Sequence, residues 1–322
     1  MVGPPGDCRL ANRALEWLLE GPAWLRYAVE LQLLDEKPDA GPALRDDAIK
    51  KLISRLKGRD SGLPVLKTGR VHYTEAGKAY WDLFFLADIG LTAAQAGLEN
   101  EVEEIFRFQS RDGCFVIPPN VQDNYFCMSA ILLASLAKMG YRDDPRLAAY
   151  IRAVMSGQCY DGGWHCYDTM EHIESCPMDN LNVLMLLGQY EQYRESPALR
   201  GAIGELLGHW SGREHRHGFG VGQRFRSLQY PAVKYGILRV LDVLSLFPSA
   251  LTSRQFQDML DFVHGKADTD GRYAAETTTG AYPDFDFDRA FEPSRWITFL
   301  VERVDKRVGK NNSKLKGQKS KL

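Results

Sequence analysis

The stretch Gln158-Cys-Tyr-Asp-Gly-Gly-Trp164 decides the fold that we predict, because variants of this turn return along the chain. In such a turn Asp and Gly satisfy the tight bend, glycine takes a positive φ, and the aromatic ring anchors the turn on the core. The turns lie at 60–63, 109–115, 158–164, 217–219 and 270–273. Their glycines are 49 to 56 residues apart, which indicates an internal repeat of about 50 residues.

The residues between the turns have the apolar period of helices, and no stretch alternates apolar and polar residues as a strand does. Each turn follows a more charged helix and precedes a more apolar one, so each repeat contains one outer and one inner helix. We expect outer helices at 43–56, 93–108, 145–155, 197–210 and 253–263. We expect inner helices at 80–89, 123–139, 179–193, 230–247 and 294–307.

Helix pairs of this kind cannot bury their apolar faces alone, so they must stack or close on one another. The inner helices are apolar over most of their circumference, which favours a closed double-layered ring, an α/α toroid, over an open solenoid. The predicted fold is therefore all-α, with a single domain at 1–305 that begins with a helical hairpin at about 10–34. Residues 306–322 contain seven basic and no acidic side chains, and we expect a disordered tail there.

The composition of the chain excludes several functional classes. The 322 residues are 44% hydrophobic and 25% charged, as in a globular protein, and a net charge of −2 gives no field that recruits nucleic acid. No apolar run approaches the roughly 18–20 residues that span a bilayer, and no signal peptide is recognisable, so we expect a cytoplasmic protein. Six cysteines are too few for a disulfide scaffold. Only the basic tail is expected to make weak contacts with anionic surfaces.

The turns resemble the repeats of squalene cyclases and of protein prenyltransferase β subunits. Residues 158–164 match the cyclase Q-x3-G-x-W (QW) motif in full, and residues 109–115 match it with Phe in place of Trp. The stretches 220–231 and 292–298 look like a group of uncharacterised prokaryotic proteins described as prenyltransferase-like or squalene-cyclase-like. The resemblance covers roughly residues 40–305. It implies a terpenoid-cyclase-like or prenyltransferase-like toroid that binds an isoprenoid-like ligand.

The acid motif of class II cyclases is absent. These enzymes protonate their substrate with an Asp-x-Asp-Asp motif, whose acid must be held neutral. Here Asp143-Asp144 lacks the preceding Asp, and Asp284-Phe-Asp-Phe-Asp288, which we expect in an acidic surface loop, has the wrong spacing. The Asp-Asp-x-x-Asp motif of ionisation-type synthases is also missing. The sequence therefore argues against triterpene cyclisation and against diphosphate ionisation through that motif.

The resemblance to prenyltransferases implies a zinc site made by an Asp-Gly-Cys turn and a later His. Asp112 and Cys114 match the turn, but Asn182 stands where the His would be, and His172 and Cys176 are the candidate replacements. A wider Cys and His group also permits a metal site or a Cys–His nucleophile, without a motif that orients it. This group is Cys159, His165, Cys166, His172 and Cys176. We expect no cofactor, with zinc as the alternative.

A closed ring would gather the starts of the inner helices around one mouth of a central cavity. Aromatic rings with a few polar groups suit an apolar small molecule with one polar end, although each residue alone also fits a helix cap or a core aromatic. The expected rim residues are Tyr73, Asp123, Asn124, Asp179, Asn180, Tyr230 and Trp296. The expected lining residues between the helices are Trp81, Cys127, Leu184 and Tyr235.

Two arginines, Arg224 and Arg226, flank an aromatic residue just before the inner helix expected at 230–247. A guanidinium group binds a carboxylate or phosphate in a bidentate manner, so we expect Arg224 to hold an anionic head group at the rim. A structural salt bridge is the alternative for both residues. The alternatives for the whole chain are a non-catalytic interaction scaffold and a sugar-active α/α barrel, which would need an inward-facing carboxylate pair.

Overall fold

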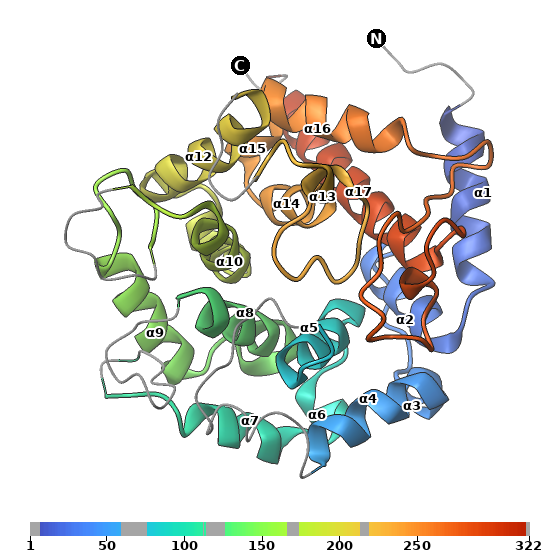
Figure 1. Ribbon diagram of the computed structural model, residues 1–322, viewed down its shortest axis with the longest axis horizontal. Coiled ribbons are helices and arrows are strands. Elements are labelled where there is room, and N and C mark those ends of the chain that lie inside the picture. Colours follow the sequence, from blue (N-terminus) through green and yellow to red (C-terminus); the bar gives the residue numbers. More distant parts are fainter. Residues whose placement is uncertain are drawn as a thin grey trace.

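The computed structural model describes residues 7–58, 76–111, 113, 126–165, 174–212 and 219–319. Its helices form a ring of two layers (Figure 1). The described residues contain isolated β-bridges, such as the one between Ala274 and Pro293, but no strand. The prediction of an all-α toroid is therefore confirmed. None of the described helices is both long enough and apolar enough to pass through a membrane.

The inner layer of the described chain closes on itself, because each inner helix contacts the next and the last contacts the first (Figure 1). Its members are α2 (Ala23–Gln32), α5 (Ala79–Ile89), α8 (Phe126–Leu136), α10 (Pro177–Leu187), α14 (Ile237–Leu244) and α17 (Arg295–Lys319). The outer layer comprises α1 (Asp7–Leu19), α4 (Asp47–Lys57), α7 (Glu99–Phe106), α9 (Pro145–Ser156), α12 (Arg200–Ser211) and α16 (Arg254–His264). Short helices connect them: α3 (Gly41–Arg45), α6 (Ala93–Ala96), α11 (Glu191–Arg194), α13 (Gln223–Arg226) and α15 (Pro248–Leu251).

The two layers differ in burial as the sequence predicts. Every residue of α5 is buried, whereas the outer helix α4 buries only Ile49, Leu52 and Leu56. Burying apolar surface on both sides of the inner layer supplies the main driving force for closing the ring.

The repeated glycine turns tie each repeat to the next. The side-chain amide of Gln158 donates to the carbonyl oxygens of Gly162 at 2.8 Å and Ala198 at 3.0 Å. Gln109 makes the equivalent bonds to Gly113 and Arg146 at 2.8 and 2.7 Å. Each glutamine thus joins its own turn to the helix that begins the next repeat. The motif that carries the family resemblance is structural in this chain.

Three element boundaries differ from the prediction by more than four residues. The inner helix expected at 179–193 ends at Leu187. The inner helix expected from residue 230 begins at Ile237, because a residue before proline is disfavoured in the helical region and Pro231 follows Tyr230. At the other end, α17 continues to Lys319, which corrects the expected disordered tail for residues 306–319. Lys306 and Lys310 both form ion pairs with Asp35 at 2.8 Å, so this basic segment has acidic partners after α2.

A buried polar network closes the ring between its first and last inner helices. The Gln32 side chain donates to the Asp88 carbonyl oxygen at 2.7 Å and accepts from Arg303 at 3.0 Å. Arg303 also donates to Asp242 at 2.9 Å, and the Asp88 carboxylate accepts from Lys138 at 2.7 Å. We call this set of five residues the closing cluster. It joins α2, α5, α14 and α17 to the π-helical turn Ala137–Tyr141 after α8.

Candidate functional site

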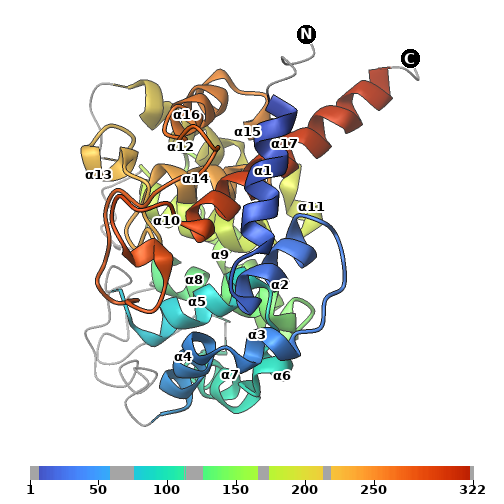
Figure 2. The same cartoon turned by 90° about the vertical axis from the view of Figure 1, so that its right-hand side faces the viewer.

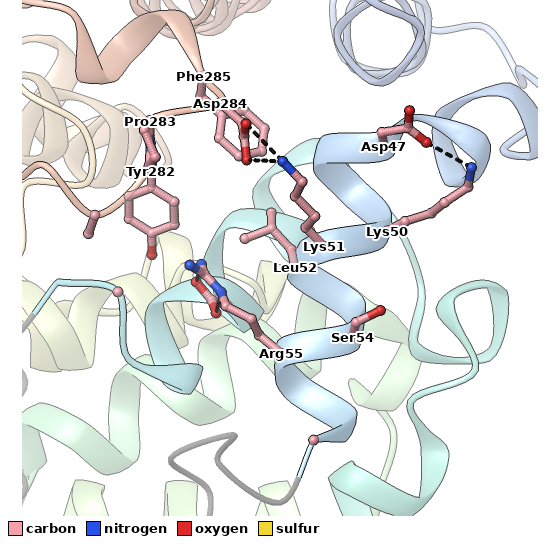
Figure 3. Close-up of a pocket in the computed structure, with 14 residues that line it drawn as sticks. Asp47, Lys50, Lys51, Leu52, Ser54, Arg55, Tyr282, Pro283, Asp284 and Phe285 are labelled. Atoms are coloured by element: carbon pink, nitrogen blue, oxygen red, sulfur yellow. Dashed lines mark hydrogen bonds and ion pairs between the residues drawn. The ribbon is translucent and has the colours of Figure 1, made fainter.

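A groove of about 1000 Å³ lies at the start of α5, between α4 and the segment that leads into α17 (Figure 3). Its volume is at the upper end of the range for small-molecule sites. Leu52, Tyr282, Pro283 and Phe285 give it an apolar wall. Its polar side chains are Asp47, Lys50, Lys51, Ser54, Arg55, Asp82 and Asp284. The groove therefore combines an apolar surface with charged groups of both signs.

The polar side chains of the groove are placed by α4. The carboxylate of Asp46 caps this helix by accepting from the Ala48 amide at 3.0 Å. Because the buried face of α4 is apolar, its basic residues point away from the core, and Lys51 and Arg55 lie four residues apart on one side. Both reach toward the segment that contains Tyr282 (Figure 3).

The opposite wall is held by two carboxylates of the Asp284-Phe-Asp-Phe-Asp288 stretch. Asp288 accepts from the backbone amides of Thr279, Gly280 and Tyr282 at 2.7 to 2.9 Å, which fixes the turn that presents Tyr282. Asp286 accepts from the Arg295 amide at 2.7 Å at the start of α17. Only Asp284 of the three lines the groove. The expected acidic surface loop is therefore mainly a structural loop.

Asp82 lies behind the groove, with only 2% of its side chain exposed. Arg55, whose side chain is 44% exposed, donates to both carboxylate oxygens, with Nε at 2.9 Å from Oδ2. Burial raises the pKa of Asp82 to about 6, and the charge of Arg55 opposes this rise. At neutral pH the carboxyl group is therefore mostly charged, and a minority of the molecules carry its proton.

Tyr282 completes the inner end of the groove. It is 1% exposed, and its hydroxyl points toward Arg55 (Figure 3). The hydroxyl also interacts with the Asp82 side chain, although it makes no hydrogen bond of standard geometry within the described residues. Burial and the nearby charge of Asp82 raise the pKa of Tyr282 well above its ordinary value. The hydroxyl is thus a neutral donor beside the buried carboxyl group.

The centre of the ring holds a second, smaller cavity. It measures about 20 Å³, room for about one water molecule, and its apolar wall includes Phe84, Leu238 and Leu300. Tyr230 closes one side, and its hydroxyl donates to Asp88 at 3.0 Å. Tyr230, predicted at the rim, therefore belongs to the interior beside the closing cluster.

The other predicted binding residues are distributed over the fold. Asn180 is buried and holds the QW turn, since its side chain accepts from the Trp164 amide at 2.7 Å and donates to Ser175 at 2.9 Å. Trp296 packs in the aromatic core against Trp24 and Phe299. The remaining described residues of this set are also buried: Trp81, Asp179, Leu184 and Tyr235. Tyr73, Asp123 and Asn124, and the side chain of Cys127, lie outside the described residues.

The two arginines of α13 differ in their surroundings. Arg224 is exposed, and α13 lies on the same side of the molecule as the segment before α17 (Figure 2). Arg226 lies over the rings of Trp210 at 4.8 Å and Phe262 at 5.6 Å, between α12 and α16. Neither arginine lines the groove. The stacking of Arg226 is a structural contact of the outer layer, whereas the head-group role of Arg224 stays a prediction.

The thiols of the described residues are poorly suited to nucleophilic chemistry. Burial raises the pKa of Cys176 to about 12, and burial also raises that of Cys159. Among the described residues, no three His, Cys, Asp or Glu side chains are grouped to hold a metal ion. Asp112, Cys114, Cys166 and His172 lie outside the described residues, so the zinc alternative stays a prediction.

Sequence reasoning did not single out Arg55, Asp82 or Tyr282. The signal that could have found Asp82 is its position in the stretch Ala79-Tyr-Trp-Asp-Leu-Phe-Phe-Leu-Ala-Asp-Ile89, which is apolar except for Asp82 and Asp88. An acid on a helix that is buried all round must have a partner or a function. No local sequence signal identifies Arg55, the partner of Asp82 on α4. The same holds for Tyr282, which lies 200 positions after Asp82 in the chain.

No protein-family model and no curated protein sequence matches the chain. The structure is similar to that of a protein from Actinoplanes, with 12% identity over 95% of this chain and 99% of that chain and a TM-score of 0.44. The structure is also similar, with the same TM-score, to apo type II terpene cyclase MstE from Scytonema. The sequence identity is 15% over 95% of this chain and 98% of that chain. A variant of that cyclase in complex with geranylgeranyl dihydroxybenzoate is also similar, with 13% sequence identity over 95% of this chain and 97% of that chain. The TM-score is again 0.44. Similarity at this level assigns neither a ligand nor a reaction to this chain.

Proposed function

We propose that this chain binds an isoprenoid-like or other apolar small molecule with one polar end in the groove, and that Asp82 donates a proton to it. The observation that carries the proposal is the buried Asp82 carboxyl group at the inner end of a groove with an apolar wall. Leu52, Tyr282 and Phe285 would cover the apolar part of the ligand, and the charged side chains would meet its polar end. The groove thus replaces the central cavity as the proposed binding site.

The size of the groove is compatible with useful affinity. Burial contributes about 0.8 kcal/mol per CH₂ group, so a ligand of ten or more carbons gains roughly 8 kcal/mol or more before the costs of association are subtracted. A fifteen-carbon ligand such as farnesol gains roughly 12 kcal/mol in the same way, and an association cost of about 4 kcal/mol would leave an affinity in the micromolar range.

The proton transfer follows from the surroundings of Asp82. A carboxyl group with its pKa raised to about 6 is protonated in part of the molecules at neutral pH, which suits a general acid. The proton would pass from the carboxyl oxygen to an alkene carbon of the ligand, which leaves a carboxylate and a cationic ligand. Loss of a neighbouring C–H proton from that cation to water would give a neutral alkene again. With an uncharged ligand, the Arg55 guanidinium, which already donates two hydrogen bonds to Asp82, would stabilise the carboxylate until a proton returns from water.

Binding is tested by displacement of a fluorescent apolar probe with farnesol. Ser54 is an exposed residue of α4 that lines the groove, so Ser54→Trp should fill part of it and weaken farnesol binding about ten-fold or more. The matched control is Ser156→Trp on α9, also exposed, which should bind as the unaltered chain does. Equal farnesol binding by both variants would refute the groove as the site. Failure of farnesol to bind the unaltered chain would favour the interaction scaffold.

Proton donation is tested in D₂O, where the acid carries deuterium. Farnesol recovered after incubation should contain deuterium or be isomerised in an amount that depends on the protein. Asp82→Asn, which keeps the size of the side chain, should bind farnesol but leave it unlabelled. Labelling that persists in this variant would show that another group is the acid, and absence of labelling with the unaltered chain would contradict the proposed chemistry for this ligand class.

A further inference from the structure

The cations of the groove are held by contacts that a ligand can replace. Lys51 pairs with Asp284 at 3.0 Å and Lys50 pairs with Asp47 at 3.0 Å, and all four side chains are at least 44% exposed. Exposed ion pairs contribute little to stability, so an incoming anion competes with them readily. Arg55 is also half-exposed at the groove, although the carboxylate it binds is buried. Three cations of α4 therefore line the groove, and two of them, Lys51 and Arg55, point to the side that faces Tyr282 (Figure 3).

Arg55 has more donors than its present partner uses. A guanidinium group offers five N–H donors in a planar fork, and two hydrogen bonds join Arg55 to Asp82. A carboxylate or phosphate that enters the groove can bind this fork in the same bidentate manner as Asp82 does. Two anions on one guanidinium repel each other, so the newcomer and Asp82 compete for Arg55.

We propose that the groove takes ligands with an anionic head group, which binds Arg55 in place of Asp82 and thereby causes Asp82 to take up a proton from solvent. This inference rests on the proposed function, because it names the ligand class of the same groove. In the free protein Arg55 keeps Asp82 charged, and in the complex the buried carboxylate has lost its cation. Binding of the ligand would thus protonate Asp82, the group that then donates a proton to that ligand.

The groups that face Asp82 support this coupling. From α4 it meets Arg55, and from the segment before α17 it meets the hydroxyl of Tyr282. Of the other cations near α5, Lys138 and Arg303 contact Asp88 at the other end of the helix, Arg239 lies over the Trp81 ring at 5.2 Å, and Lys78 is the residue before the helix. When Arg55 moves to the ligand, Asp82 therefore loses the cation that is hydrogen-bonded to it, while burial still favours its neutral form. The Tyr282 hydroxyl acts in the opposite direction, because its hydrogen bond lowers the pKa of Asp82.

The test is calorimetric titration at pH 7 with dodecanoate, dodecyl phosphate and dodecanol, which share one chain and differ in the head group. Dodecanoate should bind about ten-fold or more tightly than dodecanol. Titration in bis-Tris and in Tris, two cationic buffers that differ in ionisation enthalpy, should show uptake of roughly half a proton or more per dodecanoate bound. Comparison of dodecanoate with dodecyl phosphate shows whether a carboxylate or a phosphate is preferred.

Two variants separate the roles of the pair. Arg55→Met should lose both the preference for dodecanoate and the proton uptake, and Arg55→Lys, which keeps a charge, should recover part of the preference. Asp82→Asn should keep the preference and lose the proton uptake. The control, Arg254→Met, removes an arginine that is 91% exposed on α16 and should change neither quantity.

The outcomes distinguish this inference from the function on which it rests. If dodecanol and dodecanoate bind equally, the groove still binds apolar ligands but the inference is wrong. It is also wrong if proton uptake survives in Asp82→Asn, or if Arg224→Ala removes the preference while Arg55→Met does not. If none of the three ligands binds, the proposed function itself fails for this class.

Discussion

Replacing Arg303 by methionine should destabilise the protein strongly, because Arg303 is the buried cation of the closing cluster. Its side chain is 4% exposed, donates to Asp242 at 2.9 Å and to Gln32 at 3.0 Å, and lies 3.5 Å from the Asp88 carboxylate. Methionine keeps most of the apolar stem but removes every donor. Breaking a buried ion pair by removing one partner costs about 3–5 kcal/mol, since a buried charge is left without compensation.

The Asp88 and Asp242 carboxylates retain other partners, which places the expected cost at the lower end of that range. Lys138 still donates to Asp88 at 2.7 Å, and Arg307 still donates to Asp242 at 3.0 Å. We therefore expect Arg303→Met to reduce the free energy of unfolding by about 3 kcal/mol. At about 2–3 °C per kcal/mol for a chain of this size, the Tm should fall by roughly 6–9 °C.

The assay is urea unfolding followed by circular dichroism, at pH 7 and moderate salt. The control is Arg254→Met, whose side chain is 91% exposed and pairs with Asp258 at 3.6 Å, and which should cost about 0.5 kcal/mol or less. A loss of less than about 1 kcal/mol in Arg303→Met would refute the reasoning, because the cluster would then contribute no more than a surface ion pair.

Three further predictions concern packing, protonation and the repeat turn, each measured as the free energy of unfolding. A Cβ atom at Gly201 would lie 1.9 Å from the Asp161 carbonyl oxygen, so Gly201→Ala should cost about 2 kcal/mol or more, whereas Gly204→Ala on the same helix meets no atom within 4 Å and should stabilise by up to about 1 kcal/mol. Equal effects of the two changes would contradict this. Because burial raises the pKa of Glu302 to about 7, the folded state binds a proton that the unfolded state releases above its value of 4.5, and stability falls as pH rises from about 4.5 to 7. Glu302→Gln should therefore be more stable than the unaltered chain by about 1–3 kcal/mol at pH 8 and equal to it at pH 4, and a constant difference across this range would disprove the assignment. Gln158→Leu should cost about 1–3 kcal/mol, since two carbonyl oxygens lose their donor, and a neutral result would remove the turn from the contacts that join repeats.

The fold was predictable because each repeat needs the same two features, a glycine turn and an apolar inner helix. The turn at 158–164 needs glycine at a positive φ, and Gly162 has a φ of +84°. The stretch that forms α5 is apolar except for Asp82 and Asp88, which favours an interior helix, and it is buried throughout. The start of α14 was harder to predict, since the polar and aromatic residues at 227–236 satisfy a helical period but form tertiary contacts instead. Tyr230 bonds to Asp88, 142 positions away.

The candidate site was predicted less well than the fold. Its chemistry depends on the pairing of Arg55 with Asp82, 27 positions apart, and on Tyr282, which comes from a different repeat. These three residues come together only because the ring closes. Their contact therefore cannot be predicted from any spacing in the sequence. Arg224, which did have a local signal, is exposed and lies outside the groove. In this chain, local sequence motifs predict the structure of the repeat, but they do not predict which residues form the candidate site.

The central claim is that the ligand occupies the groove beside Asp82, and photo-crosslinking tests it most directly. A farnesol analogue that carries a diazirine should be irradiated with the protein, and the labelled peptides identified by mass spectrometry. We predict labelling of peptides from α4 and from residues 281–285, with competition by unmodified farnesol and loss of labelling in Ser54→Trp. Labelling confined to peptides of α8, α10 and α14, at the centre of the ring, would contradict the account.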